Sequence, residues 1–222
     1  MTITVLLLML SALGYVLVCH SPLFALRSIH VAGASADGLS AQRVTKAAAL
    51  PIGAPLTSLD TAGAQARIEK IPQVASARVA VRWPHTVQIT VTTRVGAALI
   101  PNGSAYDEVD GTGVIFGTVS APVAGLPVIT VQGGPAVRAA VVPGALAALN
   151  ALGSTAPDIE HEVTGISASS AYSITLRLSG GVTVVWGGGD NPVLKAQDLS
   201  ALMRYRKASA YNVSAPDAPS VS

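Results

Sequence analysis

The sequence predicts an α+β protein with a single N-terminal transmembrane helix followed by two small domains. The first 20 residues form an uncharged, apolar block. Residues 26–94 show strand-like and helix-like patterns in the order β-α-α-β-β, and residues 95–214 contain further short strands around two helices. We therefore expect a small three-stranded sheet with two helices on one face, then a second mixed α/β domain with a largely antiparallel sheet.

The clearest local pattern is a β-hairpin within Ile71–Arg94. Its apolar positions are Ala75, Ala77, Val79 and Val81 before the turn, and Val87, Ile89 and Val91 after it. Two runs with a period of two residues predict antiparallel strands with one buried face and one wet face. Pro84 has no amide hydrogen to donate, so it belongs in the turn at Trp83-Pro84-His85.

The composition excludes several classes of protein. The chain has 222 residues, of which 50% are hydrophobic and 12% are charged, and its mean hydropathy is +0.52. A soluble domain has about 25% charged residues. The net charge of +2 and the absence of a Lys/Arg cluster argue against nucleic-acid binding. Cys19 is the only cysteine, which excludes a disulfide framework and a Cys-based metal site.

The apolar block is predicted to be an uncleaved membrane anchor. A helix over Met1–Val18 is about 27 Å long, close to the thickness of a bilayer core. A secretory signal would need a basic start and a small-x-small cleavage site, and neither is clear here. A lipoprotein signal would need a small residue before Cys19, where the chain has the bulky Val18. No Lys or Arg precedes the block, so charge does not support a cytoplasmic N-terminus. The expected anchor residues are Ile3, Leu6, Leu10, Leu13, Val16 and Val18.

The first domain has clear helix-start signals. Leu26–Val31 alternates as a strand, Ser40 is a suitable N-cap, and the helix that follows is expected to stop at Pro51. Asp60 can cap a second helix over Thr61–Ile71, which leads into the hairpin.

The second half contains two further hairpin signals. Asp110-Gly111 is a tight-turn dipeptide between short strands within Ala105–Gly117. Ser173–Leu178 and Val182–Trp186 alternate on either side of Ser179-Gly180-Gly181, a pattern typical of paired strands.

Two helices and a last strand complete the predicted second domain. Pro143-Gly144 leads into a short helix at Ala145–Leu152, and Asn191-Pro192 caps and starts another. A short strand is expected at Ala210–Ser214, followed by a flexible tail over residues 215–222.

A glycine-rich segment, Gly187-Gly188-Gly189, follows a predicted strand and precedes a predicted helix. Phosphate-binding loops begin in this way. The segment has neither a GxGxxG nor a Gly-Lys-Ser/Thr pattern, and Asp190-Asn191 places an acidic residue where an anion would bind. A plain strand-to-helix turn is therefore expected.

The remaining polar residues predict no catalytic or metal-binding site. The four histidines lack ligand spacing, and the serines lie in neither Gly-x-Ser-x-Gly nor Ser-x-x-Lys. Solvated turns or faces are expected for two acidic groups: Asp107, Glu108 and Asp110, and Asp158, Glu160 and Glu162. Trp83 and Trp186 are expected to pack at sheet edges. We therefore expect a protein that is not an enzyme and that uses no cofactor, metal or small-molecule substrate.

Six segments, taken in order, resemble the FtsQ/DivIB family of bacterial cell-division proteins. "SPLFALRSIHVAG", "GAPLTSLD" and "RIEKIPQVASARVAVRWPHTVQITVTTR" look like its POTRA domain. "YDEVDGTGVIFG", "VTVVWGGGDNPVLKAQDLSALM" and "YNVSAPDAP" look like the domain that follows, and the tail looks most like actinobacterial members. The chain departs from the family at Thr93 and Asn212, where Glu and Asp are frequent.

The resemblance implies a scaffold of the divisome that links division proteins without enzymatic activity. It implies a single-pass protein of the cell membrane, with a cytoplasmic N-terminus, most of the chain outside the cytoplasm, and enrichment at the septum. In the family the C-terminal strand region recruits coiled-coil proteins of the FtsB and FtsL type. The matching positions here are Tyr211, Asn212, Val213 and Ser214. The residues alone favour an internal edge strand at these positions.

The expected organisation is an anchor (1–20), a linker (21–25), a POTRA domain (26–94), a C-terminal β domain (95–214) and a flexible tail (215–222). One alternative stays open: a secreted or membrane-tethered ligand-binding domain, or an enzyme, that is released by signal cleavage. An outer-membrane translocation protein, which also uses POTRA domains, would need a long run of barrel strands that this chain cannot supply.

Overall fold

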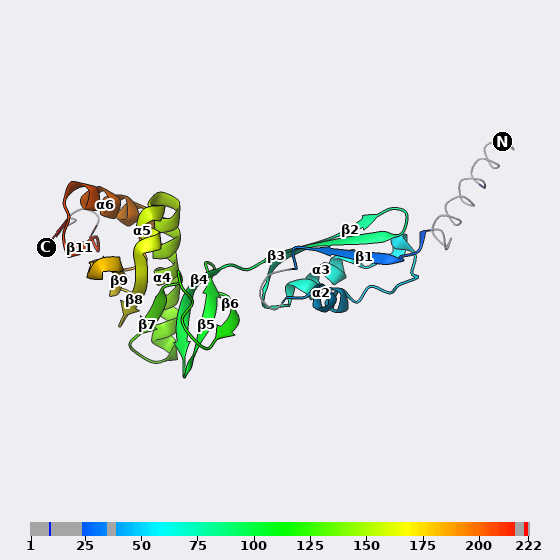
Figure 1. The fold of residues 1–222 in the computed structure, drawn as a ribbon, viewed down its shortest axis with the longest axis horizontal. Helices are drawn as coiled ribbons and strands as arrows, with labels where there is room; N and C mark the ends of the chain where they lie inside the picture. The colour runs from blue at the N-terminus through cyan, green and yellow to red at the C-terminus, as the bar shows by residue number, and fades with distance from the viewer. Residues whose placement is uncertain (1–8, 10–23, 35–38, 216–219, 222) are drawn as a thin grey trace. The chain divides into compact units, whose positions relative to one another are not determined.

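The computed structural model describes residues 9, 24–34, 39–215 and 220–221. It divides into two compact units, Met1–Arg94 and Val95–Ser222 (Figure 1). The six expected anchor residues lie outside the described part of the chain.

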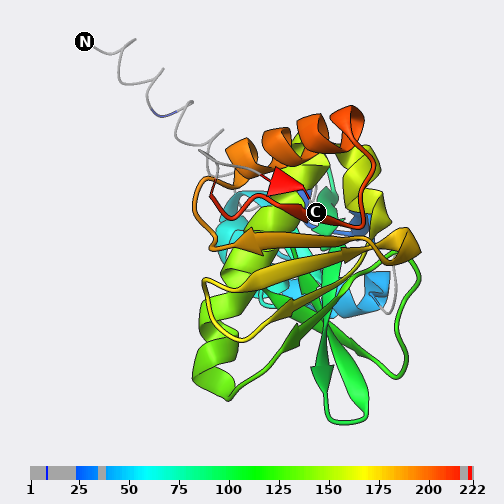
Figure 2. The same ribbon diagram turned by 90° about the vertical axis from the view of Figure 1, so that its left-hand side faces the viewer.

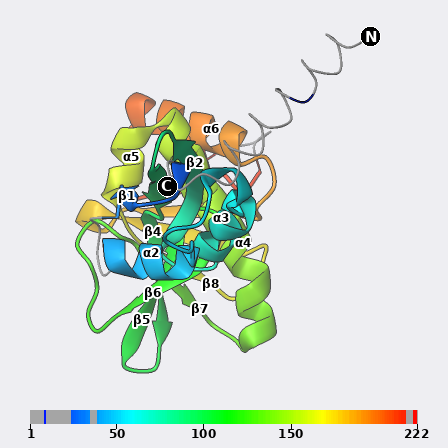
Figure 3. The same cartoon turned by 90° about the vertical axis from the view of Figure 1, so that its right-hand side faces the viewer.

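The first unit is a three-stranded sheet with two helices on one face (Figures 1 and 3). Its elements are β1 (Ser28–Ala32), α2 (Ala41–Ala48), the 3₁₀ turn η2 (Leu56–Ser58), α3 (Thr61–Glu69), β2 (Val74–Arg82) and β3 (Thr86–Thr93). The strand order is β1-β3-β2, with β1 parallel and β2 antiparallel to β3. The predicted β-α-α-β-β order is confirmed.

The helix-start signals of the first unit are confirmed, and two boundaries shift. Ser40 Oγ accepts a hydrogen bond from the Arg43 amide at 3.2 Å, and Asp60 Oδ1 accepts one from the Gly63 amide at 2.8 Å. β1 begins at Ser28 rather than Leu26, because the backbone of Leu26 bonds to the loop after α2. α3 ends two residues before the predicted end.

The hairpin of β2 and β3 has its turn at Pro84, as predicted, but its first residues are out of phase with the prediction. A bulge between Val74 and Ser76 places Val74 in the core and leaves Ala75 exposed. The prediction that Ala75 lies on the buried face is therefore wrong. Beyond the bulge the predicted apolar positions face the core, and Ile89 is fully buried.

The second unit is a nine-stranded mixed sheet. Its elements are β4 (Gly96–Asn102), β5 (Ala105–Asp110), β6 (Ile115–Val119), β7 (Val128–Val131), α4 (Pro135–Thr155), α5 (Pro157–Glu162), β8 (Val163–Ala168), β9 (Ile174–Leu178), the 3₁₀ turn η3 (Ser179–Gly181), β10 (Thr183–Gly187), α6 (Pro192–Tyr205), β11 (Ala210–Asn212) and β12 (Ser220–Val221). The strand order is β12-β11-β10-β9-β8-β7-β4-β5-β6. Five of the eight described strand pairs are antiparallel, so the sheet is largely antiparallel, as predicted.

Helix α4 packs along one face of this sheet, with α6 beside it (Figure 2). It is much longer than the predicted helix at Ala145–Leu152, and it contains Pro143. The missing amide hydrogen of Pro143 leaves the Ala139 carbonyl without its usual helical partner, but Ala139 is exposed to solvent. A buried stripe that includes Val141, Ala145 and Leu149 favours continuation of the helix across the proline.

The core of the second unit lies between α4, α6 and the sheet. Ile174, Leu176 and Leu178 point into it from β9. Trp186 is fully buried within it, so the prediction that Trp186 packs at a sheet edge is wrong. Of the helices that the structure describes, α4 alone is long and apolar enough to cross a membrane. Seven of its residues are buried in this core, which accounts for its apolar composition.

Candidate functional site

The residues expected to bind a partner lie on β11 and just after it. Tyr211 and Val213 are buried, with 3% and 0% of their surfaces exposed, whereas Asn212 is exposed and Ser214 is half-buried. This follows from strand geometry, because successive side chains point to opposite faces of a sheet. Two of the four side chains therefore belong to the core of the second unit.

The hydroxyl of Tyr211 fastens the connection between α6 and β11. It donates a hydrogen bond to the Arg206 carbonyl at 2.8 Å and accepts one from the Ala208 amide at 3.0 Å. With its ring in the core and its hydroxyl bonded, Tyr211 has a structural role in the position of β11.

The backbone of β11 bonds to different strands on its two edges. The Val213 amide donates to the Val185 carbonyl of β10 at 3.0 Å. Backbone groups of successive residues alternate between the two sides of a strand, so the amides and carbonyls of Ala210 and Asn212 point away from β10.

Strand β12 lies along this outer edge of β11. It is antiparallel to β11, with Tyr211 opposite Val221 and Asn212 opposite Ser220. At these positions the outer edge of β11 is thus paired with residues 220–221 of the chain. The two-residue β12 is the outermost strand of the described sheet.

The side chains of Asn212, the last residue of β11, and of Ser214, two residues later, set the path of the chain. Asn212 Oδ1 accepts hydrogen bonds from the Ser214 amide at 3.0 Å and the Ser214 hydroxyl at 2.7 Å. Ser214 also packs against Gly187, whose φ is +79° and whose added Cβ would lie 2.7 Å from the Cβ of Ser214. This close approach explains why a glycine ends β10.

A buried lysine fixes the glycine-rich loop between β10 and α6. Lys195 is fully buried, and its Nζ donates to the Gly188 carbonyl at 3.0 Å and to Asp190 Oδ1 at 3.2 Å. A buried ammonium group is costly unless it is paired and hydrogen-bonded. The loop therefore offers oxygen atoms to a cation, the opposite of a phosphate-binding loop, and the predicted plain turn is confirmed.

The same loop differs from the sequence prediction at the start of α6. α6 begins at Pro192 with Asn191 at the N-cap position, as predicted, but Asn191 adopts a left-handed backbone conformation (φ 44°) and its side chain makes no capping hydrogen bond. The hydrogen bond from Lys195 lowers the pKa of Asp190, and a backbone hydrogen bond lowers it further. Asp190 is therefore ionised at neutral pH and balances the buried lysine.

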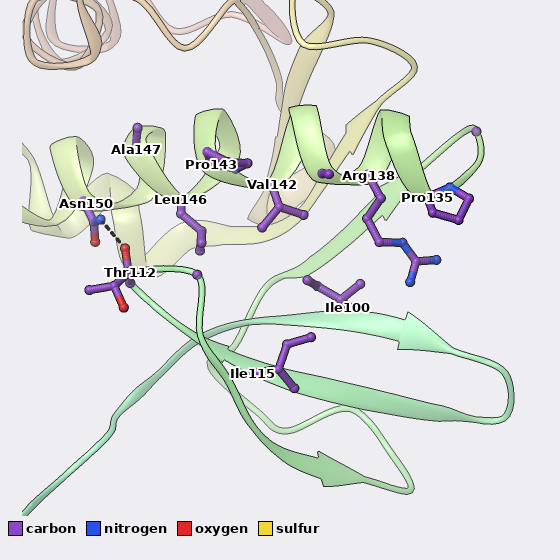
Figure 4. A pocket seen from close by; sticks show the side chains of 14 residues that line it. Ile100, Thr112, Ile115, Pro135, Arg138, Val142, Pro143, Leu146, Ala147 and Asn150 are labelled. Carbon is purple, nitrogen blue, oxygen red and sulfur yellow. Dashed lines mark hydrogen bonds between the residues drawn. The ribbon is translucent and has the colours of Figure 1, made fainter. Parts of the chain in front are cut away.

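An apolar groove of about 670 Å³ runs along α4 (Figure 4). Val142 and Leu146 point from α4 toward Ile100 and Ile115 on the strands opposite. At one end, Asn150 Nδ2 donates to the Gly111 carbonyl at 2.9 Å and joins α4 to the β5–β6 turn.

Among the described residues that line this groove, Arg138 is the only charged one, and none of them is a carboxylate. Ile115, which lines the groove opposite α4, is 52% exposed. The groove can accept apolar side chains, but the residues described along it include no pair of groups suited to acid–base or nucleophilic chemistry.

Asp110, one of the acidic residues singled out in the sequence, is buried and holds a turn together, so the prediction that it is solvated is wrong. Asp110 Oδ1 accepts hydrogen bonds from the Thr112 amide, the Thr112 hydroxyl and the Val114 amide, which closes the β5–β6 turn. Asp158, Glu160 and Glu162 lie on the short helix α5. Within the described residues, no group of three or more His, Cys, Asp or Glu is placed to hold a metal ion.

The two units match two family models in succession. Residues 24–94 match the POTRA domain, FtsQ-type, and residues 98–214 match the C-terminal domain of cell division protein FtsQ/DivIB. The second match alone covers more than half of the chain. The chain belongs to the FtsQ/DivIB family of cell division proteins.

Relatives named cell division protein FtsQ are similar over most of the chain. The protein of Streptomyces venezuelae is 36% identical over 99% of this chain and 82% of its own length. That of Mycobacteroides abscessus is 36% identical over 98% of this chain and 68% of its own length. That of Streptomyces griseus is 34% identical over 89% of this chain and 97% of its own length. The predicted resemblance to actinobacterial members of the FtsQ/DivIB family is thus confirmed.

Three features of this FtsQ/DivIB family member were missed in the sequence. The burial of Lys195 is hard to predict, because its distance of five residues from Asp190 is the only hint in the sequence of an ion pair at the start of the helix. β12 is too short to show a period, and the groove depends on α4 continuing through Pro143.

Proposed function

We propose that this chain is a non-enzymatic scaffold of the divisome, held in the cell membrane by residues 1–20. In this proposal the N-terminus is cytoplasmic, residues 21–25 link the anchor to the first unit, and both units lie outside the cytoplasm at the septum. Membership of a cell-division family supports the proposal, and so does a site made of surfaces rather than reacting groups. Tethering to one membrane raises the effective concentration of the units toward other tethered proteins.

We assign partner binding to the outer edge of β11 and to the residues that follow it. The observation that supports this most directly is the outward direction of the Ala210 and Asn212 backbone groups, which an extended partner segment can bond. Coiled-coil proteins of the FtsB and FtsL type are the proposed partners, by similarity to the family. β12 contributes only Ser220 and Val221 to this edge, so a longer partner strand can replace it.

The register of β11 provides a direct test with purified full chain and an FtsB/FtsL-type partner complex. Asn212→Pro removes an outward amide, which faces the two-residue β12, whereas Val213→Pro removes the amide that bonds to Val185 of β10. We expect Asn212→Pro to keep the melting temperature and lose partner capture. We expect Val213→Pro to lower both.

Asn212→Ala is the matched control, because it removes the bonds to Ser214 and keeps the outward amide. It should retain partner capture. A folded Asn212→Pro protein that captures the partner normally would exclude strand addition at this edge. Deletion of residues 215–222 should strengthen capture, because the partner then no longer competes with β12.

A further inference from the structure

The first unit carries an exposed apolar cluster at the end where the described chain enters it. The rings of Phe24 and Trp83 meet edge to face, with centroids 5.4 Å apart and planes at 75°. Trp83 is 54% exposed and Ile52 is 63% exposed. We call Phe24, Ile52 and Trp83, together with the exposed Arg27 and Arg82, the entry cluster.

Backbone hydrogen bonds bring the parts of the entry cluster together. The Leu26 amide donates to the Ala54 carbonyl at 2.9 Å, and the Arg27 amide donates to the His85 carbonyl at 2.8 Å. The segment before β1 therefore runs between the loop after α2 and the turn of the β2–β3 hairpin. Segments far apart in the sequence meet at one end of the sheet (Figure 1).

The charge around the entry cluster has one sign. Residues 24–27, 51–55 and 82–86 contain no Asp or Glu. Residues 24–94 contain eight Lys or Arg and three Asp or Glu, a formal charge of +5, whereas residues 95–222 contain six and nine, a formal charge of −3. An anionic surface will therefore attract the first unit and not the second.

The entry cluster is also close in sequence to the apolar block. Phe24 follows Cys19 by five residues, which span at most about 18 Å when fully extended. If the block spans the bilayer, as proposed above, the cluster lies within reach of the membrane surface. Exposed tryptophan beside arginine is typical of the membrane–water interface, where a ring enters the headgroup layer and a guanidinium stays near water.

We infer that the entry cluster docks on the bilayer, and that its ligand is the headgroup region of anionic lipids. Trp83, Phe24 and Ile52 enter the interface, and Arg27 and Arg82 pair with lipid phosphates. β1 and β3 run parallel away from this end, so Arg94 lies at the other end of the sheet. Docking thus orients the first unit so that its C-terminal end, at Arg94, points away from the membrane.

The two tryptophans of the chain provide the test. Full chain is placed in phosphatidylcholine vesicles that contain phosphatidylglycerol and lipids brominated near the headgroup. The fluorescence difference between the unmodified chain and Trp83→Phe isolates Trp83, because Trp186 is unchanged and buried in the second unit. We expect brominated lipid to quench this difference signal, and the bilayer to shield it from aqueous acrylamide.

Flotation of the vesicles distinguishes a failure of the membrane anchor from a failure of the entry cluster to dock. A chain that floats with an unquenched Trp83 overturns docking and leaves the anchor intact. A chain that does not float overturns the anchor and docking together.

Arg78→Gln and Arg82→Gln form a matched pair for the lipid contact. Both residues are exposed on β2, and Arg78 is four residues, about 13 Å, further from the turn. On anionic vesicles we expect Arg82→Gln to reduce the docking equilibrium constant about fivefold, and Arg78→Gln to leave it unchanged. On pure phosphatidylcholine the two variants should be alike. Equal loss for both on anionic vesicles would overturn the local contact.

Discussion

The Nζ of Lys195 lies 3.2 Å from Oδ1 of Asp190, and the two side chains differ completely in burial. Lys195 has no exposed side-chain surface, whereas 64% of the Asp190 side chain is exposed. Burial of both ions of a pair costs several kcal/mol for each. Here one ion stays in contact with water, so the loop between β10 and α6 holds a buried charge at the desolvation cost of a single ion.

Acid should weaken the second unit through Asp190. Because its pKa is lowered in the folded chain, ionised Asp190 stabilises the fold above its unfolded pKa, and this contribution is lost as the pH falls through the lower folded value. We expect the melting temperature of the unmodified chain to fall more steeply below about pH 4 than that of Asp190→Asn. The effect should be small, because the carboxylate is largely exposed. Parallel pH curves would contradict a stabilising role for the pair.

In the first unit, Ile89 should matter more than the residue directly opposite it, Val79. Ile89 is fully buried on the central strand and Val79 is half-buried. We expect Ile89→Ala to cost about 2–5 kcal/mol of unfolding free energy, measured by urea denaturation of the full chain.

On β2, Val79→Asp should also destabilise the first unit, whereas Arg78→Glu on the wet face should change the unfolding free energy by no more than about 0.5 kcal/mol. If Val79→Asp and Arg78→Glu unfold alike, the assignment of faces on β2 is wrong.

The anchor proposal predicts the location of the C-terminus. A reporter active only in the cytoplasm, fused after Ser222, should be silent in cells, because the proposal places the chain beyond residue 20 outside the cytoplasm. The same fusion to a chain lacking residues 1–20 should be active and serves as the control. A silent fusion protein whose mature N-terminus lies near Ser21 would instead favour release by signal cleavage.

Local interactions made much of the first unit predictable. The Ser40 and Asp60 caps bond to amides three residues away, so their effect is contained in a few neighbouring residues. The exception was the start of β2, where a bulge at Val74 shifts the alternation by one residue. A bulge depends on the partner strand, and an alternating run gives no sign of it.

The candidate site was less predictable because it depends on contacts between distant segments. The alternation of Tyr211 and Asn212 predicts which side chain is buried only after β10 is known to lie beside them, in parallel. The pairing of β12 adds two residues that follow a segment with no strand pattern. The start of α4 could not be predicted from the sequence, because burial of its apolar stripe in the core, rather than Pro143, decides where that helix begins.

Gly187 should be the least replaceable glycine near the candidate site. Its φ of +79° disfavours any residue with a Cβ, and an added Cβ would lie 2.7 Å from that of Ser214. Gly180 provides the control, because its φ of +71° is similar but nothing lies within 4 Å of an added Cβ. Gly180→Ala should therefore cost only the strain of the backbone, about 1–2 kcal/mol.

Gly187→Ala should cost more than Gly180→Ala, because Ser214 must also move and β11 must shift with it. We expect a larger loss of unfolding free energy in urea, together with weaker capture of the FtsB/FtsL-type partner at temperatures where the variant remains folded. Gly180→Ala should capture the partner normally. Equal stability loss in the two variants would mean that the chain after β11 can move away from Gly187 without cost. The path of that segment would then not be fixed by this contact.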